Sequence, residues 1–258
     1  MKLATWNVNS IRIRAERLLA WLDRERPDVI CLQETKVEDA AFPFEALRKA
    51  GYEVAVFGQR SYNGVAIAST QPLADVTRGF GDGPHDGDAD DARTIAATTH
   101  GIRVVCVYVP NGQDLASDRY PYKLAWLRRL RAYLERTSAP DAPLVLCGDM
   151  NVTPDDRDVW SPEKWKDQIH CSAPERAALA EVAAFGLVDL FRAHNGDAKL
   201  YSWWDYRGVA FFKDQGLRID LIFGTRPIAE RCTACTIDRA ARKGQDASDH
   251  APVIATLA

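Results

Sequence analysis

Several short segments of the chain carry polar side chains that could do chemistry, and each lies beside an apolar run. The residues of interest are Asn7, Glu34, Tyr108, Asn111, Asp149, Asn151, Asp220, Asp249 and His250. One carboxylate after a strand is most often a helix cap or a turn former, so no member of this set is persuasive alone. In layered α/β proteins, however, such groups gather at one rim of a sheet, so we expect a shared site.

This combination of carboxylate, amide, hydroxyl and imidazole groups suits the hydrolysis of a phosphodiester. The phosphodiester is an anion that repels hydroxide, and more negative charge develops on its oxygens in the transition state. A hard divalent cation on oxygen ligands supplies positive charge, while amides and an imidazolium supply hydrogen-bond donors. One carboxylate can deprotonate the attacking water, and another behind a histidine fixes its tautomer and raises its pKa.

The elements that position these residues are short β-rich runs and a few amphipathic segments. We expect helices over 11–24, 121–136 and 173–185, and strands over 2–8, 28–33, 53–57, 64–69, 94–99, 103–109, 143–147, 200–205, 218–223 and 252–257. Several strands follow one another with no helix between them, which excludes a simple doubly wound sheet. Two mixed β-sheets packed face to face with helices outside, in one domain spanning 1–258, fit better.

Composition limits the class of protein. The chain has 258 residues, of which 47% are hydrophobic, as in ordinary globular domains. No signal peptide follows Met1 and no apolar stretch approaches a membrane span, so we expect a cytoplasmic protein with no membrane partner. The six cysteines are scattered, which is typical of reduced cysteines used as small buried side chains.

Seven blocks along the chain resemble the signature blocks of the exonuclease III family. In order they are W-N-V-N-S-I (6–11), L-Q-E-T-K (32–36), N-G-V-A-I (63–67), G-D-M-N (148–151), Y-S-W-W-D-Y-R (201–207), G-L-R-I-D-L-I (216–222) and S-D-H-A-P-V (248–253). That family joins bacterial exonuclease III with class II abasic-site endonucleases, within the wider endonuclease/exonuclease/phosphatase superfamily. The blocks run from residue 6 to residue 253, so the resemblance covers essentially the whole chain.

The resemblance implies a four-layered α/β sandwich of the DNase I-like type and a requirement for Mg²⁺ or Mn²⁺. Glu34 resembles the family's principal metal carboxylate, and Asp249 resembles a further carboxylate at or near the metal. The implied metal residues are Asn7, Glu34, Asp149, Asn151 and Asp249, with Asn9 beside them.

The resemblance also implies roles in the chemical step and in DNA contact. Asp149 matches the aspartate that aligns and activates the attacking water, and Asp220 with His250 matches a carboxylate–imidazole pair. The implied catalytic residues are Tyr108, Asp149, Asn151, Asp220 and His250. The implied phosphate or DNA contacts are Asn111, Lys123, His170, Trp203, Arg207 and Phe211, with Lys123 the looser match.

The implied activity is cleavage of phosphodiester bonds in double-stranded DNA by a monomer. It includes 3′-to-5′ exonuclease, 3′-end processing as a 3′-phosphatase or phosphodiesterase, and abasic-site endonuclease activity. His170 leaves their balance open. It is either structural, or it fills space beside the sugar pocket and favours 3′ ends over abasic sites.

Two other functions are alternatives to a DNA repair phosphodiesterase. Another superfamily phosphoesterase, such as a DNase I-like nuclease or an inositol phosphate phosphatase, shares the same core groups, but the aromatic block at 201–207 disfavours it. A non-catalytic binding module would lack a catalytic group, and none is missing from the sequence.

The charge of the chain argues mildly against DNA binding. The net charge is −3, whereas nucleic-acid binders are usually basic. The segment 79–91 holds five aspartates, and we expect it to form a loop that faces away from DNA. Without those aspartates the rest is slightly basic. We expect a strip drawn from Lys36, Arg207, Lys213 and Arg218 to bind DNA, more weakly as salt rises.

Overall fold

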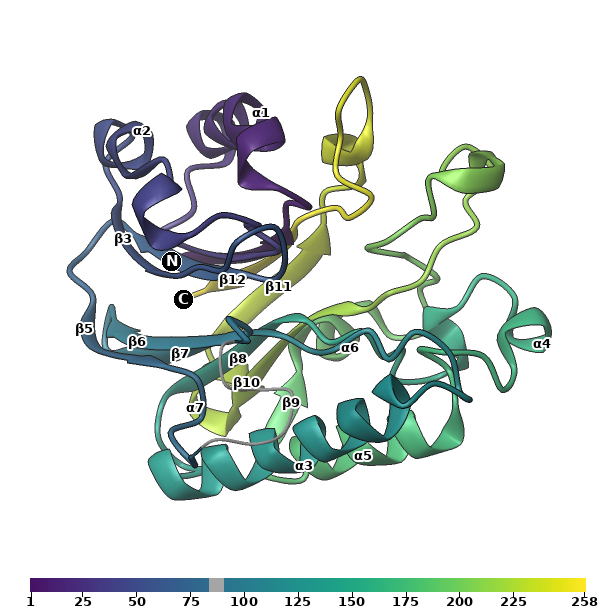
Figure 1. Ribbon diagram of the computed structural model, residues 1–258. Coiled ribbons are helices and arrows are strands. Elements are labelled where there is room, and N and C mark those ends of the chain that lie inside the picture. The colour runs from purple at the N-terminus through teal and green to yellow at the C-terminus, as the bar shows by residue number, and fades with distance from the viewer. Residues whose placement is uncertain (84–90) are drawn as a thin grey trace.

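Two six-stranded β-sheets form the centre of the computed structural model, which describes residues 1–83 and 91–258 (Figure 1). The first sheet consists of β1 (Lys2–Asn7), β2 (Val29–Gln33), β3 (Glu53–Phe57), β4 (Val65–Ser69), β11 (Cys232–Ile237) and β12 (Val253–Leu257). The second consists of β5 (Ala74–Arg78), β6 (Thr94–Thr99), β7 (Ile102–Tyr108), β8 (Leu144–Asp149), β9 (Leu187–Asp189) and β10 (Asp220–Thr225).

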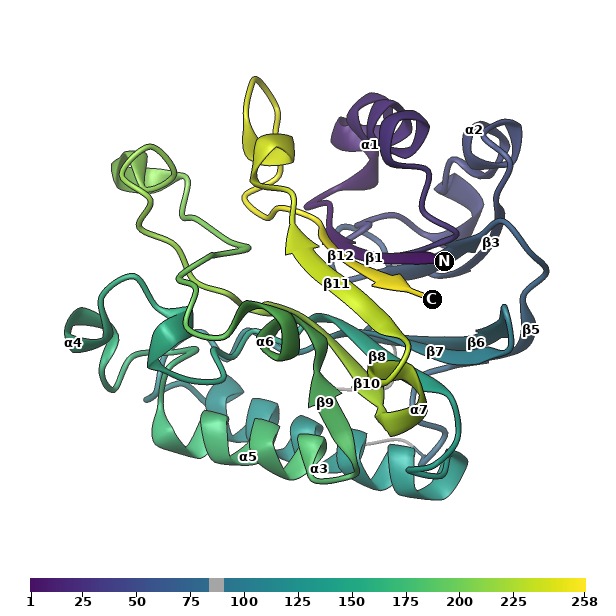
Figure 2. The ribbon, with the colours of Figure 1, turned by 180° about the vertical axis from the view of Figure 1, so that it is seen from behind.

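Both sheets are mixed. The strand order is β11-β12-β1-β2-β4-β3 in the first sheet and β5-β6-β7-β8-β10-β9 in the second. β1 runs parallel to β2, and β7 runs parallel to β8, while the other neighbouring strands in these two orders are antiparallel. Because β12 pairs with β1, the two ends of the chain lie in the same sheet (Figure 2).

Helices and 3₁₀ turns flank the two sheets. They are α1 (Ile11–Glu25), α2 (Phe44–Lys49), α3 (Arg119–Thr137), α4 (Pro162–Trp165), α5 (Ala173–Ala183), α6 (Leu190–Asn195) and α7 (Arg226–Ala229), with 3₁₀ turns η1 (Asp39–Ala41), η2 (Asp156–Asp158), η3 (Arg207–Val209) and η4 (Arg239–Arg242). α1 and α2 lie on the first sheet, and α3 and α5 lie on the second (Figure 1). The predicted four-layered α/β sandwich is therefore confirmed.

Three layers of apolar side chains hold these elements together. The inner faces of both sheets share one cluster, which includes Val29, Cys31, Val104 and Ile222. A second cluster joins the second sheet to α3 and α5, and a third joins the first sheet to α1 and α2. Strands packed on both faces need apolar residues at every position, which is why β2 and β8 are apolar runs in which each residue is buried.

Gly148 allows β8 to deliver its last residue to the rim of the sheet. Its φ is +145°, and a Cβ at this position would lie 1.9 Å from the carbonyl oxygen of Val107 on the parallel neighbour β7. Only glycine fits such a close approach of two backbones. The G-D-M-N block therefore places Asp149 at the end of a buried strand for a steric reason.

The structure corrects some of the predicted elements. The segment 200–205 is not a strand: Trp203 makes only isolated bridges, to Leu217 and His250. Ser202 explains this, because its Oγ accepts the N–H groups of Ile219 and Asp220 that a neighbouring strand would otherwise pair. The sequence reading missed β5, β9 and β11, and most of the short helices.

Two further points concern the described part of the chain. The predicted acidic loop over 79–91 falls mainly on residues 84–90, which lie outside the described residues. Among residues 1–83 and 91–258, no helix has both the length and the apolar character needed to cross a membrane.

Candidate active site

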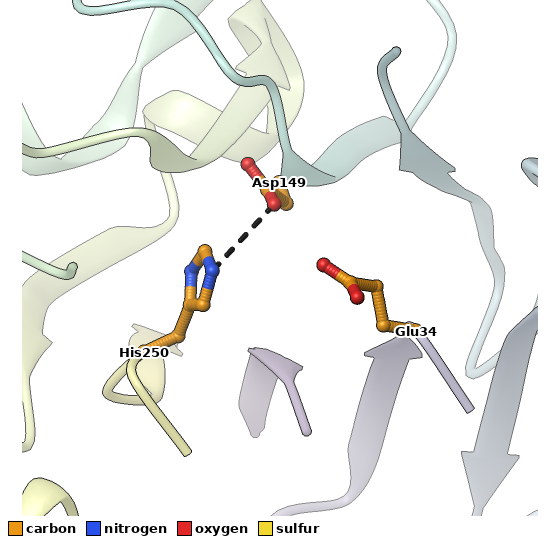
Figure 3. Close-up of side chains that lie close together, drawn as sticks. All are labelled: Glu34, Asp149 and His250. Atoms are coloured by element: carbon orange, nitrogen blue, oxygen red, sulfur yellow. Dashed lines mark ion pairs between the residues drawn. The ribbon is translucent and has the colours of Figure 1, made fainter. Parts of the chain in front are cut away.

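Polar residues from both sheets meet at one rim of the sandwich (Figure 3). Asn7 ends β1, Glu34 follows β2, Asp149 ends β8, and His250 precedes β12. Glu34 has a φ of +52° and Asn151 a φ of +49°, a left-handed conformation that is uncommon for residues other than glycine. Such backbone conformations cluster at functional sites, where the surrounding structure over-determines them.

The centre of the site is a group of ionisable side chains. One ligand-type atom from each of Glu34, Asp149 and His250 lies within 4.8 Å of the other two. Asn7 bridges the two carboxylates, since its Nδ2 donates to Glu34 Oε1 at 2.8 Å and to Asp149 Oδ2 at 3.0 Å. The predicted proximity of Asn7, Glu34 and Asp149 is thus present in the structure.

His250 lies between two aspartates of the second sheet. Its Nδ1 is 2.8 Å from Asp220 Oδ2, and its Nε2 is 3.8 Å from Asp149 Oδ2 (Figure 3). Burial alone would lower the pKa of His250, but the charges of Asp220 and Asp149 raise it to about 10. His250 is therefore an imidazolium at neutral pH. In this form both of its nitrogens carry protons and can donate hydrogen bonds.

The pKa of Asp149 is also raised, to about 7. Burial raises its pKa, the His250 charge lowers it, and the nearby Asp220 and Glu34 carboxylates raise it further. The excess of negative charge around Asp149 favours a cation or a proton at this point. Asp149 is therefore suited to act as a base once a positive charge offsets the negative charge of the neighbouring carboxylates.

Asn151 and Asn111 bring amide groups to the same rim. The N–H of Asn151 donates to Asp149 Oδ1 at 2.9 Å, and its Nδ2 donates to the carbonyl of Val109 at 2.9 Å. Asn111 Nδ2 lies 3.4 Å from Asn151 Oδ1. Burial and the nearby Glu34 carboxylate raise the pKa of Tyr108 well above its usual value, so its hydroxyl stays protonated.

Asp249 and Lys36 flank this group. The Asp249 carboxylate accepts Asn9 Nδ2 at 2.9 Å and Trp203 Nε1 at 3.0 Å. Lys36 Nζ lies 2.7 Å from Glu34 Oε2 and also donates to Asn9 Oδ1 at 2.5 Å. Asp249 is therefore connected to Glu34 through two residues, Asn9 and Lys36, and Lys36 belongs to the site as well as to its rim.

His170 lies on the far side of the asparagines, beside Trp203. Its Nδ1 is 2.6 Å from the carbonyl oxygen of Asn151, its Nε2 is 3.5 Å from Asn111 Nδ2, and its ring centroid is 6.3 Å from that of Trp203. Burial, and then the charge of Lys123, lower the pKa of His170 to about 3. The ring is therefore neutral, and it occupies the space between Asn111 and Trp203.

Three expected DNA contacts are wrong. Lys123 is fully buried, with its Nζ bonded to protein groups behind the site, so it cannot reach a phosphate. Phe211 is buried against Trp204, while its neighbour Phe212 is 85% exposed. Arg218 is fully buried between Asp158 and Asp189, so it is not part of a basic strip.

Arg207 lies on the surface as expected, with 91% of its side chain exposed.

Two residues near the site were not predicted from the sequence. The guanidinium of Arg93 lies over the Tyr108 ring at 4.7 Å from its centroid. Glu175 is buried behind His170, and the S-x-x-E capping box that it forms with Ser172 was a signal in the sequence for that position.

The chain belongs to the Endonuclease/Exonuclease/phosphatase family, whose model matches residues 4–250. Exodeoxyribonuclease III from Haemophilus influenzae is 36% identical to it, over 98% of this chain and 98% of that protein. The resemblance to the exonuclease III family that the seven blocks indicated is thereby confirmed.

Solved structures agree with this membership. An AP endonuclease from Archaeoglobus fulgidus is 40% identical with a TM-score of 0.94. The 3′ phosphatase NExo from Neisseria, bound to a product DNA hairpin, is 38% identical with a TM-score of 0.95. Each similarity covers 100% of this chain and 99% of the other.

Proposed function

We propose that this chain is a DNA repair phosphodiesterase that hydrolyses phosphodiester bonds at 3′ ends and abasic sites of double-stranded DNA. The observation that carries this function is the position of Asp149, whose carboxylate faces Glu34 on one side and the His250–Asp220 pair on the other. The similarity to exodeoxyribonuclease III and to AP endonuclease over the whole chain supports the same activity.

Asp149 is the base. Its carboxylate is held in place by Asn7 Nδ2 and by the backbone N–H of Asn151, so one orientation is available to a water that it binds. It aligns that water with the phosphorus and takes its proton. His250, protonated and held by Asp220, donates a hydrogen bond to a phosphoryl oxygen as negative charge grows there.

The amides and the tyrosine complete the binding of the phosphate. Asn151 and Asn111 offer N–H donors at the rim, and Tyr108 offers a hydroxyl that stays protonated. Each is neutral, so these groups stabilise the phosphoryl oxygens without competing for the water's proton.

The residues present fit a hard divalent cation. Glu34 and Asp149 offer carboxylate oxygens held close together by Asn7 Nδ2, and the crowded carboxylates that raise the pKa of Asp149 create a local excess of negative charge. We infer that Glu34 holds Mg²⁺ or Mn²⁺, with Asn7, Asp149, Asn151 and Asp249 contributing. Held there, such an ion would supply positive charge to the phosphate and would lower the pKa of Asp149.

Processing of 3′ ends is the dominant activity in this proposal. An extrahelical sugar entering beside the site needs room, and the His170 ring takes up the space between Asn111 and Trp203. A 3′-terminal phosphate needs less room on that side. The whole-chain similarity to the 3′ phosphatase NExo supports this order of activities.

DNA contact is assigned to the exposed groups around the rim. Arg207, Lys213 and Lys36 supply positive charge, with Trp203 beside the site. The segment 205–215 projects from the body of the molecule (Figure 1), and Phe212 is exposed at 85% and Val209 at 55%. Apolar side chains of this kind can wedge into a duplex at a lesion. A monomeric state and a cytoplasmic location stay predictions of the sequence.

The direct test is incubation of the purified chain and Mg²⁺ with a nicked duplex that carries a 3′-phosphate. We expect release of inorganic phosphate and a 3′-hydroxyl end that a polymerase extends. An intact 3′-phosphate after complete loading with metal would contradict the proposed function.

A further inference from the structure

A buried ion pair lies directly behind the active site. Lys123 belongs to α3 and Glu175 to α5, helices that pack side by side on the second sheet (Figure 1), and both side chains have 0% exposure. Taking two charges out of water is costly, and the cost is offset only where further hydrogen bonds satisfy both groups. The partners in those further hydrogen bonds show which segments of the chain the ion pair positions.

Lys123 donates hydrogen bonds to the backbone of the two segments that carry the asparagines of the site. In addition to Glu175, its Nζ donates to the carbonyl oxygen of Asn111 at 3.0 Å and to that of Asn151 at 2.6 Å. An ammonium has three donors, so all three are used. Lys123 Nζ thus holds the segments that carry Asn111 and Asn151 next to each other.

Glu175 holds the backbone of the segment that carries His170. Its Oε1 accepts the N–H of His170 at 3.0 Å, and its Oε2 accepts the N–H of Ser172 at 3.1 Å. On the other side of His170, the carbonyl oxygen accepts the N–H of Thr153 at 2.8 Å. His170 has a φ of +73°, so these bonds maintain a backbone conformation that non-glycine residues rarely adopt.

We propose that the Lys123–Glu175 ion pair sets the substrate choice of the enzyme by holding the His170 ring between Asn111 and Trp203. Both residues are positioning residues, because neither touches the substrate space. The inference rests on the proposed function, in which the His170 ring favours 3′ ends over abasic sites. A pair that only joined α3 to α5 would leave that choice unchanged.

The test compares variants by the ratio of abasic-site incision to 3′-phosphate hydrolysis. Lys123→Met with Glu175→Leu removes the pair without leaving a lone buried charge. Glu175→Asp keeps the charge but draws the carboxylate back from the His170 N–H, and it serves if the double variant does not fold. Leu179→Ala, a buried position on the same α5, is the matched control for loss of stability alone.

We expect the ratio to rise by up to about 10²-fold in the double variant and by a smaller factor in Glu175→Asp, because a displacement near 1 Å can change a rate by about 10²-fold. Leu179→Ala should lower Tm and leave the ratio at the wild-type value. In a His170→Ser background the double variant should leave the ratio unchanged, since the pair acts through His170.

The His170 ring signals in NMR, assigned by their loss in His170→Ser, give a readout that does not depend on activity. We expect them to shift and broaden in the double variant and in Glu175→Asp. Unchanged signals and an unchanged ratio in a folded variant would overturn the inference. If wild type and His170→Ser instead gave the same ratio, the proposed preference for 3′ ends would fail, and the NMR signals alone would show whether the pair holds the ring.

Discussion

His250 Nδ1 lies 2.8 Å from Asp220 Oδ2, although the two residues come from different sheets. Asp220 begins β10 in the second sheet, and His250 lies three residues before the start of β12 in the first. The contact therefore depends on the face-to-face packing of the sheets. It keeps His250 protonated beside the carboxylate of Asp149.

Asp220 and His250 should behave as one unit in catalysis. Asp220→Asn and His250→Ala each remove the held imidazolium, so each should lower kcat by about 10² to 10⁴-fold. The double variant should be little worse than the worse single variant, because residues that act as a unit are not additive. Single-turnover rates at saturating DNA measure this. Multiplying losses would show that the two residues act separately.

Asp149→Asn should abolish most turnover while DNA binding changes little. The substitution keeps the shape and removes the base, and kcat should fall by about 10² to 10⁴-fold. In the wild type, burial and neighbouring carboxylates raise the pKa of Asp149, so the base form is lost as pH falls through that raised value. Because a bound cation lowers this pKa, the acidic limb of the kcat profile should move to lower pH as metal concentration rises. A limb that stays fixed would rule out Asp149 as the titrating base.

Removal of divalent cation should abolish activity, and Mg²⁺ or Mn²⁺ should restore it. Glu34→Ala should raise the metal concentration needed for half-maximal rate, since it removes the carboxylate that the site offers most openly. Glu38→Ala, an exposed acid four residues away, is the matched control and should leave the metal titration unchanged. Full activity in excess chelator would exclude the proposed metal.

Arg218→Met should destabilise the fold rather than weaken DNA binding. Arg218 is fully buried and pairs with Asp158 and Asp189, so its loss removes the cation that these two carboxylates share and leaves Arg192 as the remaining ion-pair partner of the buried Asp158. We expect the free energy of unfolding to fall by about 3–5 kcal/mol. Arg207→Met, at an exposed position, should leave the free energy of unfolding nearly unchanged and weaken DNA binding instead. Urea unfolding of both variants separates the two outcomes.

The layers and the centre of the site were predictable because they depend on local patterns. The apolar runs within β2 and β8 predict strands that are buried on both faces. A polar residue at the end of such a run must lie at the rim of the sheet. Glu34 and Asp149 were found in this way. β5 was missed because it lies at a sheet edge with most of its residues exposed, so it has no apolar pattern.

The direction of individual charged and aromatic side chains was not predictable. Lys123 and Arg218 look like surface cations in the sequence, and their acidic partners lie 52 and 60 residues away along the chain. Phe211 and Phe212 are adjacent and chemically identical, yet one is buried and the other exposed. Such choices depend on tertiary packing, which local periodicity does not encode.

The most direct test of the central claim is a parallel time course on two duplexes, one with a recessed 3′-phosphate and one with an internal abasic site. With Mg²⁺ present, the wild type should hydrolyse both and process the 3′-phosphate faster. His170→Ser should raise abasic-site incision relative to 3′-phosphate release, because it empties the space between Asn111 and Trp203. Cleavage of neither duplex would contradict the assignment as a DNA repair phosphodiesterase, and a wild type that favours the abasic site would contradict the role given to His170.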